Sequence, residues 1–389
     1  MTDVTTEAPV PGARIPAERG TSTRLAANVL DVFVRSIVPV LLALVAGAIL
    51  LLALGRNPLT FYGDIWKGGI ELGAWQDSLM RAAPLLLIAI GLTVVFRANI
   101  WNLGYDGQFL LGAALISGLG PWIVTREPLW FALTVLFLVA GAAGAAWTIV
   151  PAALKAYYGT NEIITTLMMS FIGVGVANIL IKGPFQDPTV NIPETRVLPL
   201  DKMLPSIPGT RVHVGVLVAF AAVIVVHFVL TRTSFGLRLQ VLGANPRAAR
   251  HMGVKLPRVI VMSFLVSGFL IGMAAAADIL GIWGYVRSNW NPAYGDTVIP
   301  FVFLARLNVL ALVPYVLFYA VLSTGGDLAT EHANLTTDFL LVLVALILIF
   351  MTLIEYFGRR RALGTSYLTP GLRQSLRVPW RTTSKAAAE

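Results

Sequence analysis

Long apolar runs separated by short polar segments dominate the chain, which is the pattern of a protein that crosses a membrane several times. The first run, 37–54, holds 18 uncharged residues, and a helix of that length spans most of a bilayer core. The uncharged runs are 37–54, 82–96, 109–125, 128–154, 163–181, 214–230, 259–277 and 339–354. We predict a membrane-spanning helix in each of these eight runs.

Another apolar stretch, 298–322, is interrupted by Arg306, Asn308 and Pro314. It is too long for one spanning helix and short for two. We predict two short spans joined by a tight turn at residues 306–308. The total is then about ten transmembrane helices, and an even number places both chain ends on the same side of the membrane.

Loop charges give the orientation of these spans. Segment 231–258 contains six basic residues and no acidic one, and the tail from residue 359 is also basic. Both should be cytoplasmic under the positive-inside rule. Segments 183–211 and 323–338 are balanced or acidic and should face outward. Ten spans with a cytoplasmic amino terminus satisfy every one of these assignments.

The predicted fold class is therefore all-α, a polytopic membrane helical bundle with both termini cytoplasmic. We expect a polar cytoplasmic N-terminal tail at 1–35, a transmembrane domain at 36–358 and a basic cytoplasmic C-terminal tail at 359–389. Within the transmembrane domain, 231–258 is the principal cytoplasmic loop. Small residues recur at 140–146 and at Gly268, Gly272 and Ala276, which permits close helix packing within one subunit or at a dimer face.

Composition agrees with this class and excludes several functions. Apolar residues make up 57% of the 389 and charged residues 13%, whereas soluble domains average about 45–50% and about 25%. The chain has no cysteine and four histidines without metal-site spacing, so we expect no bound metal. No phosphate-binding P-loop motif or catalytic constellation occurs, so we expect neither ATPase nor other enzymatic activity. The net charge of +9 lies beside apolar runs, which favours membrane lipid over nucleic acid.

Within the basic loop, segment 243–253 predicts a short helix. Asn245 suits the N-cap, Pro246 the first helical position and Gly253 the left-handed end. A helix of about seven residues is not stable alone and must dock. Ala248, Ala249 and Met252 share one face, with Arg247 and Arg250 beside it. The face fits a groove on a soluble partner, or alternatively the protein's own bundle or anionic headgroups.

Three other polar segments could carry function. Residues 97–108 combine Asn, Asp and Gln with two glycines, which fits a broken helix lining a cavity. The alternative is a cytoplasmic turn in which Asp106 caps the next helix. Residues 159–162 fit an N-cap with Glu162 in the first turn. The aromatic region 283–296 is an interfacial belt or an outward vestibule.

The loop sequence also resembles a known family. Ser-Phe-Gly-Leu-Arg at 234–238, followed by Gly243-x-Asn-Pro-x-Ala-Ala-x-x-x-Gly253, is similar to the coupling loop of ABC-importer permeases for ribose-type sugars, nucleosides and branched-chain amino acids. Asn-Leu-Gly-Tyr-Asp-Gly-Gln at 102–108 is similar to the Asn-Ile-Gly-x-Glu-Gly-Gln signature of the sugar and nucleoside branch. Residues 159–162 resemble the segment before that branch's fifth span.

The resemblance implies an integral subunit of an ATP-driven importer in the bacterial inner membrane, which moves a small polar solute, a nucleoside or simple sugar, by alternating access. Its partners would be a second permease subunit, identical or paralogous, an external solute-binding protein and ATPase subunits that use ATP and magnesium, with no cofactor on this chain. The implied ATPase-coupling residues are Gly243, Asn245, Pro246, Arg247, Ala248, Ala249, Arg250, Met252 and Gly253. The implied substrate path comprises Asn102, Tyr105, Asp106, Gln108, Asn161, Glu162, Thr165 and Ser170.

Two substitutions depart from that branch, since Asp106 replaces its glutamate and Ser170 stands where it often has asparagine. Residues 294–301 follow its pattern only in part. An alternative of another class is a proton-coupled secondary transporter, which requires titratable groups inside the spans. Asp106 is the plausible candidate for such a group. A membrane-embedded enzyme is disfavoured, because catalytic groups do not cluster.

Overall fold

The computed structural model describes residues 21–336 and 338–362. These residues form helices and contain no extended strand, so the all-α class is confirmed. Their contacts define two units, of which the larger, residues 42–350, holds every site discussed below. The smaller unit contains the first part of α1 and the last part of α14.

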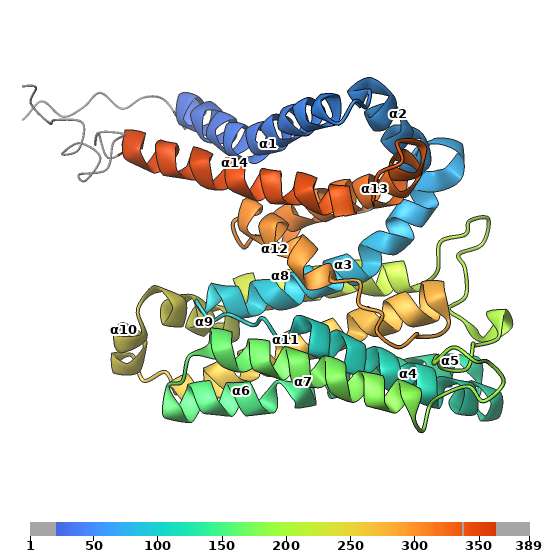
Figure 1. Cartoon of the computed structure of the whole chain (residues 1–389). Helices are drawn as coiled ribbons and strands as arrows, with labels where there is room; N and C mark the ends of the chain where they lie inside the picture. Colours follow the sequence, from blue (N-terminus) through green and yellow to red (C-terminus); the bar gives the residue numbers. More distant parts are fainter. Residues whose placement is uncertain (1–20, 337, 363–389) are drawn as a thin grey trace, which may run out of the picture. The chain divides into compact units, whose positions relative to one another are not determined.

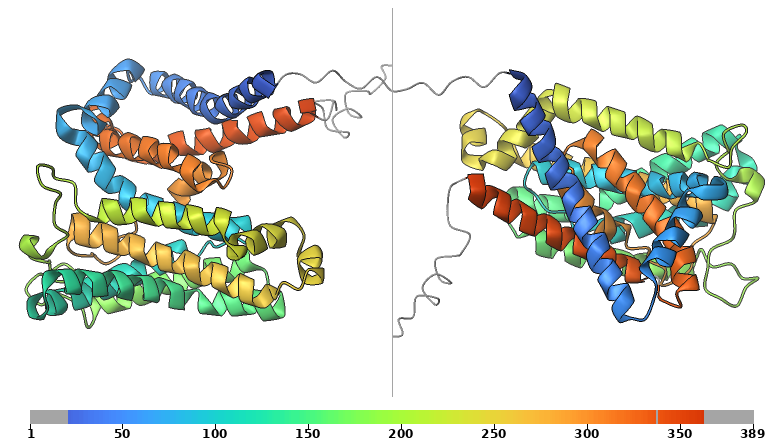
Figure 2. Two further views of the ribbon diagram at one scale, coloured as in Figure 1. Left: turned by 180° about the vertical axis from the view of Figure 1, so that it is seen from behind. Right: turned by 90° about the horizontal axis from the view of Figure 1, so that it is seen from above.

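The helices follow one another with short connections, except for the segment 183–214 (Figures 1 and 2). They are α1 Thr21–Ala53, α2 Pro58–Gly69, η1 Glu71–Gly73, α3 Ala74–Arg97, α4 Tyr105–Arg126, α5 Leu129–Trp147, α6 Ile149–Ala153, η2 Leu154–Tyr158, α7 Glu162–Lys182, η3 Leu200–Lys202, α8 Gly215–Arg232, α9 Ser234–Ala244, α10 Pro246–His251, α11 Leu256–Asp278, η4 Ile279–Trp283, α12 Tyr294–Leu304, α13 Val309–His332 and α14 Asp338–Ala362.

Eight helices of the described chain are long and apolar enough to cross a membrane. Two shorter apolar segments, Ile37–Ala53 and Tyr294–Leu304, complete the set that the sequence predicts. A multi-pass helical bundle is thus confirmed. The number of crossings and the cytoplasmic position of the termini stay predictions.

The predicted turn near residue 306 is present. Arg306 and Leu307 have φ of 52° and 59°, which breaks the chain between α12 and α13. Asn308 then caps α13 by accepting a hydrogen bond from the Leu310 amide at 3.1 Å. The Arg97 guanidinium donates to the Leu307 carbonyl at 3.1 Å and to the Leu230 carbonyl at 3.2 Å. Arg97 thus ties this turn to the ends of α3 and α8.

Three helix ends differ from the positions that the sequence pattern indicates. Segment 323–338 was expected to be an external loop, but α13 continues to His332 because it packs closely on α2. A Cβ on Gly325 would lie 2.0 Å from the Ile65 carbonyl oxygen, so the two backbones touch there. At the amino end, α1 begins at Thr21 rather than after residue 35, and α14 extends to Ala362 past the predicted tail boundary. The rest of both predicted tails, 1–20 and 363–389, lies outside the described residues.

The small residues pack α5 against α11 inside one subunit, so one of the two alternatives for them is confirmed. A Cβ on Gly272 would lie 2.0 Å from the Ala140 carbonyl oxygen, and one on Gly144 would lie 2.1 Å from the Gly268 carbonyl oxygen. The two backbones therefore approach too closely for any side chain at these positions. In lipid, such contact replaces the hydrophobic effect as the attraction between helices.

Segment 183–214 connects α7 to α8 and packs on the end of α11. Its amide at Thr195 donates to the Val286 carbonyl at 3.0 Å, and that at Leu204 donates to the Leu280 carbonyl at 2.9 Å. His213, at its end, is 2% exposed, and neither ring nitrogen has a hydrogen-bond partner. Burial lowers the pKa of His213 from 6.5 to about 4, because the charged imidazolium is poorly solvated there.

This burial predicts an acid-dependent loss of stability. The pKa of His213 is lower in the folded state than in the unfolded state. Its contribution to the free energy of unfolding is therefore fully present above pH 6.5 and falls as the pH drops toward about 4. The maximal loss is about 3 kcal/mol at about 1.4 kcal/mol per pKa unit. His213→Leu should therefore flatten the dependence of Tm on pH in detergent-purified protein, whereas the exposed His251→Leu should not. An unchanged slope for His213→Leu would contradict the assignment.

Candidate functional site

Two non-helical segments enter the bundle, 98–104 before α4 and 284–293 before α12. Asn99 and Ala293 have φ of 55° and 50°, which stops helix formation in each. α12 is 11 residues long, about 16 Å, which is half of a hydrocarbon core of about 30 Å. Because α12 ends beside the turn held by Arg97, its amino end lies about half the length of a span away from the ends of α3 and α8.

Asn102 and Gln108 form a buried amide pair at the same depth. The Asn102 amide donates to Gln108 Oε1 at 3.2 Å and to Ser267 Oγ at 3.1 Å, and the Gln108 amide donates to Asn102 Oδ1 at 3.0 Å. Asn102 is 0% and Gln108 1% exposed. Ser267 lies near the middle of the apolar stretch Leu256–Trp283, so the pair lies about halfway along this candidate span. Asn102 Oδ1 also accepts the Gly104 amide at 3.1 Å, so the pair holds the non-helical backbone.

α7 supplies the other bonds to this segment. Thr166 Oγ1 accepts the Leu103 amide at 3.0 Å, and Ser170 Oγ accepts the Gly107 amide at 3.2 Å. Gly107 allows this approach, since a Cβ there would lie 3.0 Å from the Ser170 backbone. Thr166 was not among the candidate residues of the sequence. Its spacing of four from Ser170 places both hydroxyls on one helix face, and this spacing could have revealed it.

Asn161, Glu162 and Thr165 lie away from this amide pair. Asn161 caps α7 by accepting the Ile163 amide at 3.0 Å, as the capping interpretation expected. Glu162 pairs with Lys155 at 2.6 Å, and Thr165 donates to the Asn161 carbonyl at 3.2 Å. The structure therefore brings these three together at the start of α7, separately from Asn102 and Gln108.

Four polar side chains meet where α4 and α12 begin, and we call Tyr105, Asp106, Asn291 and Asp296 the midplane junction. The Tyr105 hydroxyl donates to the Asp296 carboxylate. The Asn291 amide donates to Asp106 Oδ2 at 3.2 Å. Asp106 and Asp296 each lie in the first turn of their helix, where the helix dipole favours negative charge. α12 has the length of a half-helix, whereas α4 is long enough for a full span. Half-helices that present polar groups at their amino ends are typical of transporter substrate sites.

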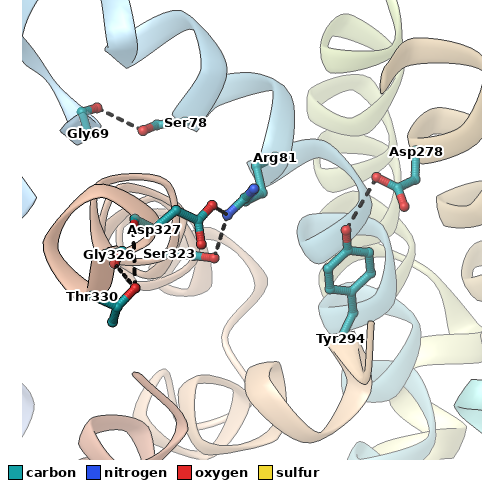
Figure 3. A network of polar contacts seen from close by, with 9 residues as sticks. All are labelled: Gly69, Ser78, Arg81, Asp278, Tyr294, Ser323, Gly326, Asp327 and Thr330. Carbon is teal, nitrogen blue, oxygen red and sulfur yellow. Dashed lines mark hydrogen bonds and ion pairs between the residues drawn. The ribbon is translucent and has the colours of Figure 1, made fainter. Parts of the chain in front are cut away.

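A second polar network lies on the predicted external side of the junction (Figure 3). Arg81 of α3 donates to Ser323 Oγ at 2.9 Å and to Asp327 Oδ2 at 3.0 Å on α13. Tyr294 of α12 donates to Asp278 Oδ1 of α11 at 3.4 Å, and Asp278 is 0% exposed. Charged groups inside spans are costly and often mark solute or ion pathways.

Three aromatic rings fill the predicted cytoplasmic side of the junction. Phe96 and Trp101 lie 5.0 Å apart between ring centroids, and Phe303 lies 5.2 Å from Phe96 and 5.5 Å from Trp101. These rings come from α3, the segment 98–104 and α12. The described chain therefore has polar groups on one side of the junction and a packed aromatic cluster on the other.

The predicted short helix of the basic loop is present as α10. Asn245 Oδ1 accepts the amides of Arg247 at 3.0 Å and Ala248 at 3.2 Å, Pro246 opens the helix, and Gly253 has φ of 76°. α10 projects beyond the ends of the neighbouring helices (Figures 1 and 2). The expected caps are therefore confirmed.

The predicted apolar face of α10 needs a correction. Ala249 is 0% exposed, because it packs inside the chain, whereas Met252 is 68% exposed. The surface that α10 offers outward consists instead of Pro246, Arg247, Arg250 and Met252, which we call the α10 outer surface.

Gly243 anchors the same loop to the end of α3. A Cβ on Gly243 would lie 2.3 Å from the Arg97 carbonyl oxygen, so α9 and α3 are in backbone contact there. Arg97 directly precedes the segment 98–104. The loop that carries α10 is thus packed directly on the start of the segment that leads to the midplane junction.

Comparison with known proteins identifies the family. Residues 75–352 match the family model of the branched-chain amino acid transport system permease component. The chain belongs to this permease family. It is 32% identical over 340 residues to a glucose ABC transporter permease protein of Haloferax volcanii, covering 84% of this chain and 88% of that protein. It is 29% identical over 255 residues to a guanosine ABC transporter permease protein of Bacillus subtilis, covering 64% and 72%.

The permease is thus the membrane-spanning subunit of an ABC importer and a multi-pass inner-membrane protein. Its family is one of transporter permeases and not of catalytic enzymes, and membership implies that ATP is used by partner ATPase subunits. Solute-binding-protein partners are implied in the same way. The proton-coupled secondary transporter considered above belongs to a different class from this family.

The amide pair gives a test of the site's architecture. Asn102→Leu should leave the polar groups of Gln108 and Ser267 and the Gly104 amide without this partner. Each buried polar group left unsatisfied lowers the free energy of unfolding by about 1–3 kcal/mol. The Tm of the purified permease should fall by several degrees in a thermal unfolding scan. The matched change at an exposed position, Asn191→Leu, should leave it unchanged. Equal Tm values for the two variants would show that Asn102 does not hold the segment.

Proposed function

We propose that this permease moves a neutral polyhydroxylated solute, a sugar or a nucleoside, along the midplane junction. The junction carries the proposal, because the amino ends of α4 and α12 bring Tyr105, Asp106, Asn291 and Asp296 together. Carboxylates accept hydrogen bonds from hydroxyl groups, and side-chain amides both accept from and donate to them. The relatives' names, which include glucose, guanosine and nucleoside transporters, support the same class.

The charges beside the junction favour a neutral solute over an anion. Acidic side chains outnumber basic ones in these two groups of described residues: Asp106 and Asp296 belong to the junction, and Asp278 and Asp327 belong to the network that contains Arg81. An anionic solute would be repelled by this arrangement, whereas hydroxyl groups can donate to it. Three residues predicted on the path have their polar atoms bonded within the protein and hold the backbone next to the junction: Asn102, Gln108 and Ser170.

We further propose that the α10 outer surface docks on an ATPase subunit. A helix of six residues is too short to be stable without its caps and packing. The large apolar side chain of its C-cap, Met252, is nevertheless exposed, as are Arg247 and Arg250 of the helix. An exposed apolar side chain with a charged rim fits a groove on a soluble partner. Alternating access then follows when ATP binding moves the docked helix and the path opens to the other side.

The remaining partners in this proposal are a solute-binding protein on the external face and a second permease subunit. Bacillus subtilis contributes two different guanosine ABC transporter permease proteins to the relatives, which supports a paralogous pair. An identical second copy is the alternative, and the mass of the purified complex distinguishes the two.

Removing the junction carboxylates tests the solute path. Asp106→Asn together with Asp296→Asn should lower uptake by at least about 10-fold, since one lost charged hydrogen bond is worth about 1.5–3 kcal/mol. The measurement is uptake in vesicles containing the complete transporter, with sugars and nucleosides as solutes. The control Asp201→Asn, in the segment 183–214, should retain uptake. Undiminished uptake in the double variant would place the path elsewhere.

Charging the α10 outer surface tests the coupling. Met252→Glu should abolish solute-stimulated ATP hydrolysis and lower uptake by at least about 10-fold, because an unpaired charge would be buried at the interface. Met252→Leu, which nearly conserves volume, should retain both activities. Membrane insertion should be equal in the two variants. Ala249→Glu is unsuitable for this test, because Ala249 is buried within the permease itself. Full activity of Met252→Glu would refute docking through this surface.

A further inference from the structure

An apolar groove separate from the midplane junction runs between α8 and α11. Its volume is about 980 Å³, at the upper end of the usual range for small-molecule pockets. Side chains of α8 and α11 form the walls, Val94 of α3 and Ala145 of α5 contribute to the floor, and Thr233 and Phe235 close one end. We call it the α8–α11 groove.

The groove has the length of one membrane leaflet. On α8 its lining runs from Val218 to Val229, and on α11 from Met262 to Met273. Each stripe covers about 16 Å at about 1.5 Å per residue, whereas half of a bilayer core is about 15 Å. The α11 stripe extends on both sides of Ser267, so the groove crosses the middle of the span. An acyl chain that enters from the end near α9 can lie along it, whereas a complete spanning helix of a partner is too long.

Basic side chains continue both stripes at the end that carries α9. Arg232 follows Val229 by three residues on α8, and Arg258 precedes Met262 by four residues on α11. These spacings place each arginine on the same helix face as the groove. Both side chains are exposed, and among the described residues neither forms an ion pair. The loop 231–258 contains no acidic residue that could neutralise them.

We propose that the α8–α11 groove binds one anionic phospholipid of the cytoplasmic leaflet, with an acyl chain along the groove and the phosphate between Arg232 and Arg258. Basic pockets at the cytoplasmic ends of spanning helices attract anionic headgroups. A helix of a second copy fits less well, because helices in lipid associate through small residues, whereas Val, Met, Leu and Phe side chains line most of this groove.

The lipid would also contact the loop that carries α10. Phe235 lies on α9 and lines the groove, and α9 leads directly into Asn245 and α10. A bound acyl chain therefore holds α9 against the bundle, and the position of the α10 outer surface depends on it. This effect of anionic lipid is separate from docking itself, since Phe235 is not part of that surface.

Retention of lipid by the full-length permease tests the proposal. We expect native mass spectrometry of protein taken from vesicles of phosphatidylcholine and phosphatidylglycerol to show one retained phosphatidylglycerol. Arg232→Gln with Arg258→Gln should weaken its retention about 30-fold, since each basic residue near the surface is worth about 1 kcal/mol. The matched pair Arg126→Gln with Arg196→Gln has the same charge change at the other end of the bundle and should leave retention unchanged.

A steric variant tests the groove without changing charge. Ala221 lines the groove and is exposed, so Ala221→Phe should displace the acyl chain and lower retention of phosphatidylglycerol. Ile224→Phe on the outer face of the same helix is the control. Equal retention in Ala221→Phe and Ile224→Phe, equal retention of phosphatidylcholine and phosphatidylglycerol by the native chain, or a change of oligomeric state in Ala221→Phe would overturn the proposal. The last result would show that a protein helix fills the groove.

Discussion

Backbone polar groups at membrane depth need partners inside the protein, and the satisfaction of those in segment 98–104 is the constraint on which this permease depends. Lipid offers no hydrogen bonds, so non-helical backbone survives there only where side chains supply them. Asn102 and Thr166 do so for the Gly104 and Leu103 amides. Without these bonds the segment could not remain unwound, and α4 could not begin where its first turn meets α12.

The same constraint explains why the polar groups divide into two kinds. Asn102 and Gln108 bond one another and are closed to solute, whereas Asp106 and Asp296 each have a single side-chain partner in the described chain and retain unused acceptor capacity. The first kind gives the site a fixed shape. The second kind is available for a solute that moves through.

Much of the fold follows from sequence because its causes are local. Uncharged runs predict the spans, and Asn245, Pro246 and Gly253 predict α10, since capping depends on neighbours in the chain. The family motif identifies the importer class. The small residues of α5 and α11 indicate close packing, although the sequence leaves open whether it occurs within or between subunits.

Other features depend on tertiary contacts and could not be predicted. Arg81 and Asp278 flank apolar runs and look like the ends of spans, yet both lie within helices and bond polar groups of α13 and α12. Ala249 shares a helical face with Met252 by spacing, but packing of the loop on α3 decides that Ala249 turns inward. The residues of the midplane junction come from distant parts of the chain, and pattern alone does not join Asp106 to Asn291.

The contact of Gly243 with Arg97 connects the loop that carries α10 directly to the end of α3. The Arg97 guanidinium, at the end of α3, donates to the carbonyls of Leu230 at the end of α8 and of Leu307 after α12, so it holds these three helix ends together. Segment 98–104 follows Arg97 directly in the chain. In the proposed coupling, a displacement of the loop that carries α10 would therefore reach the midplane junction through the few residues of irregular backbone at 98–104, without the shift of an entire span.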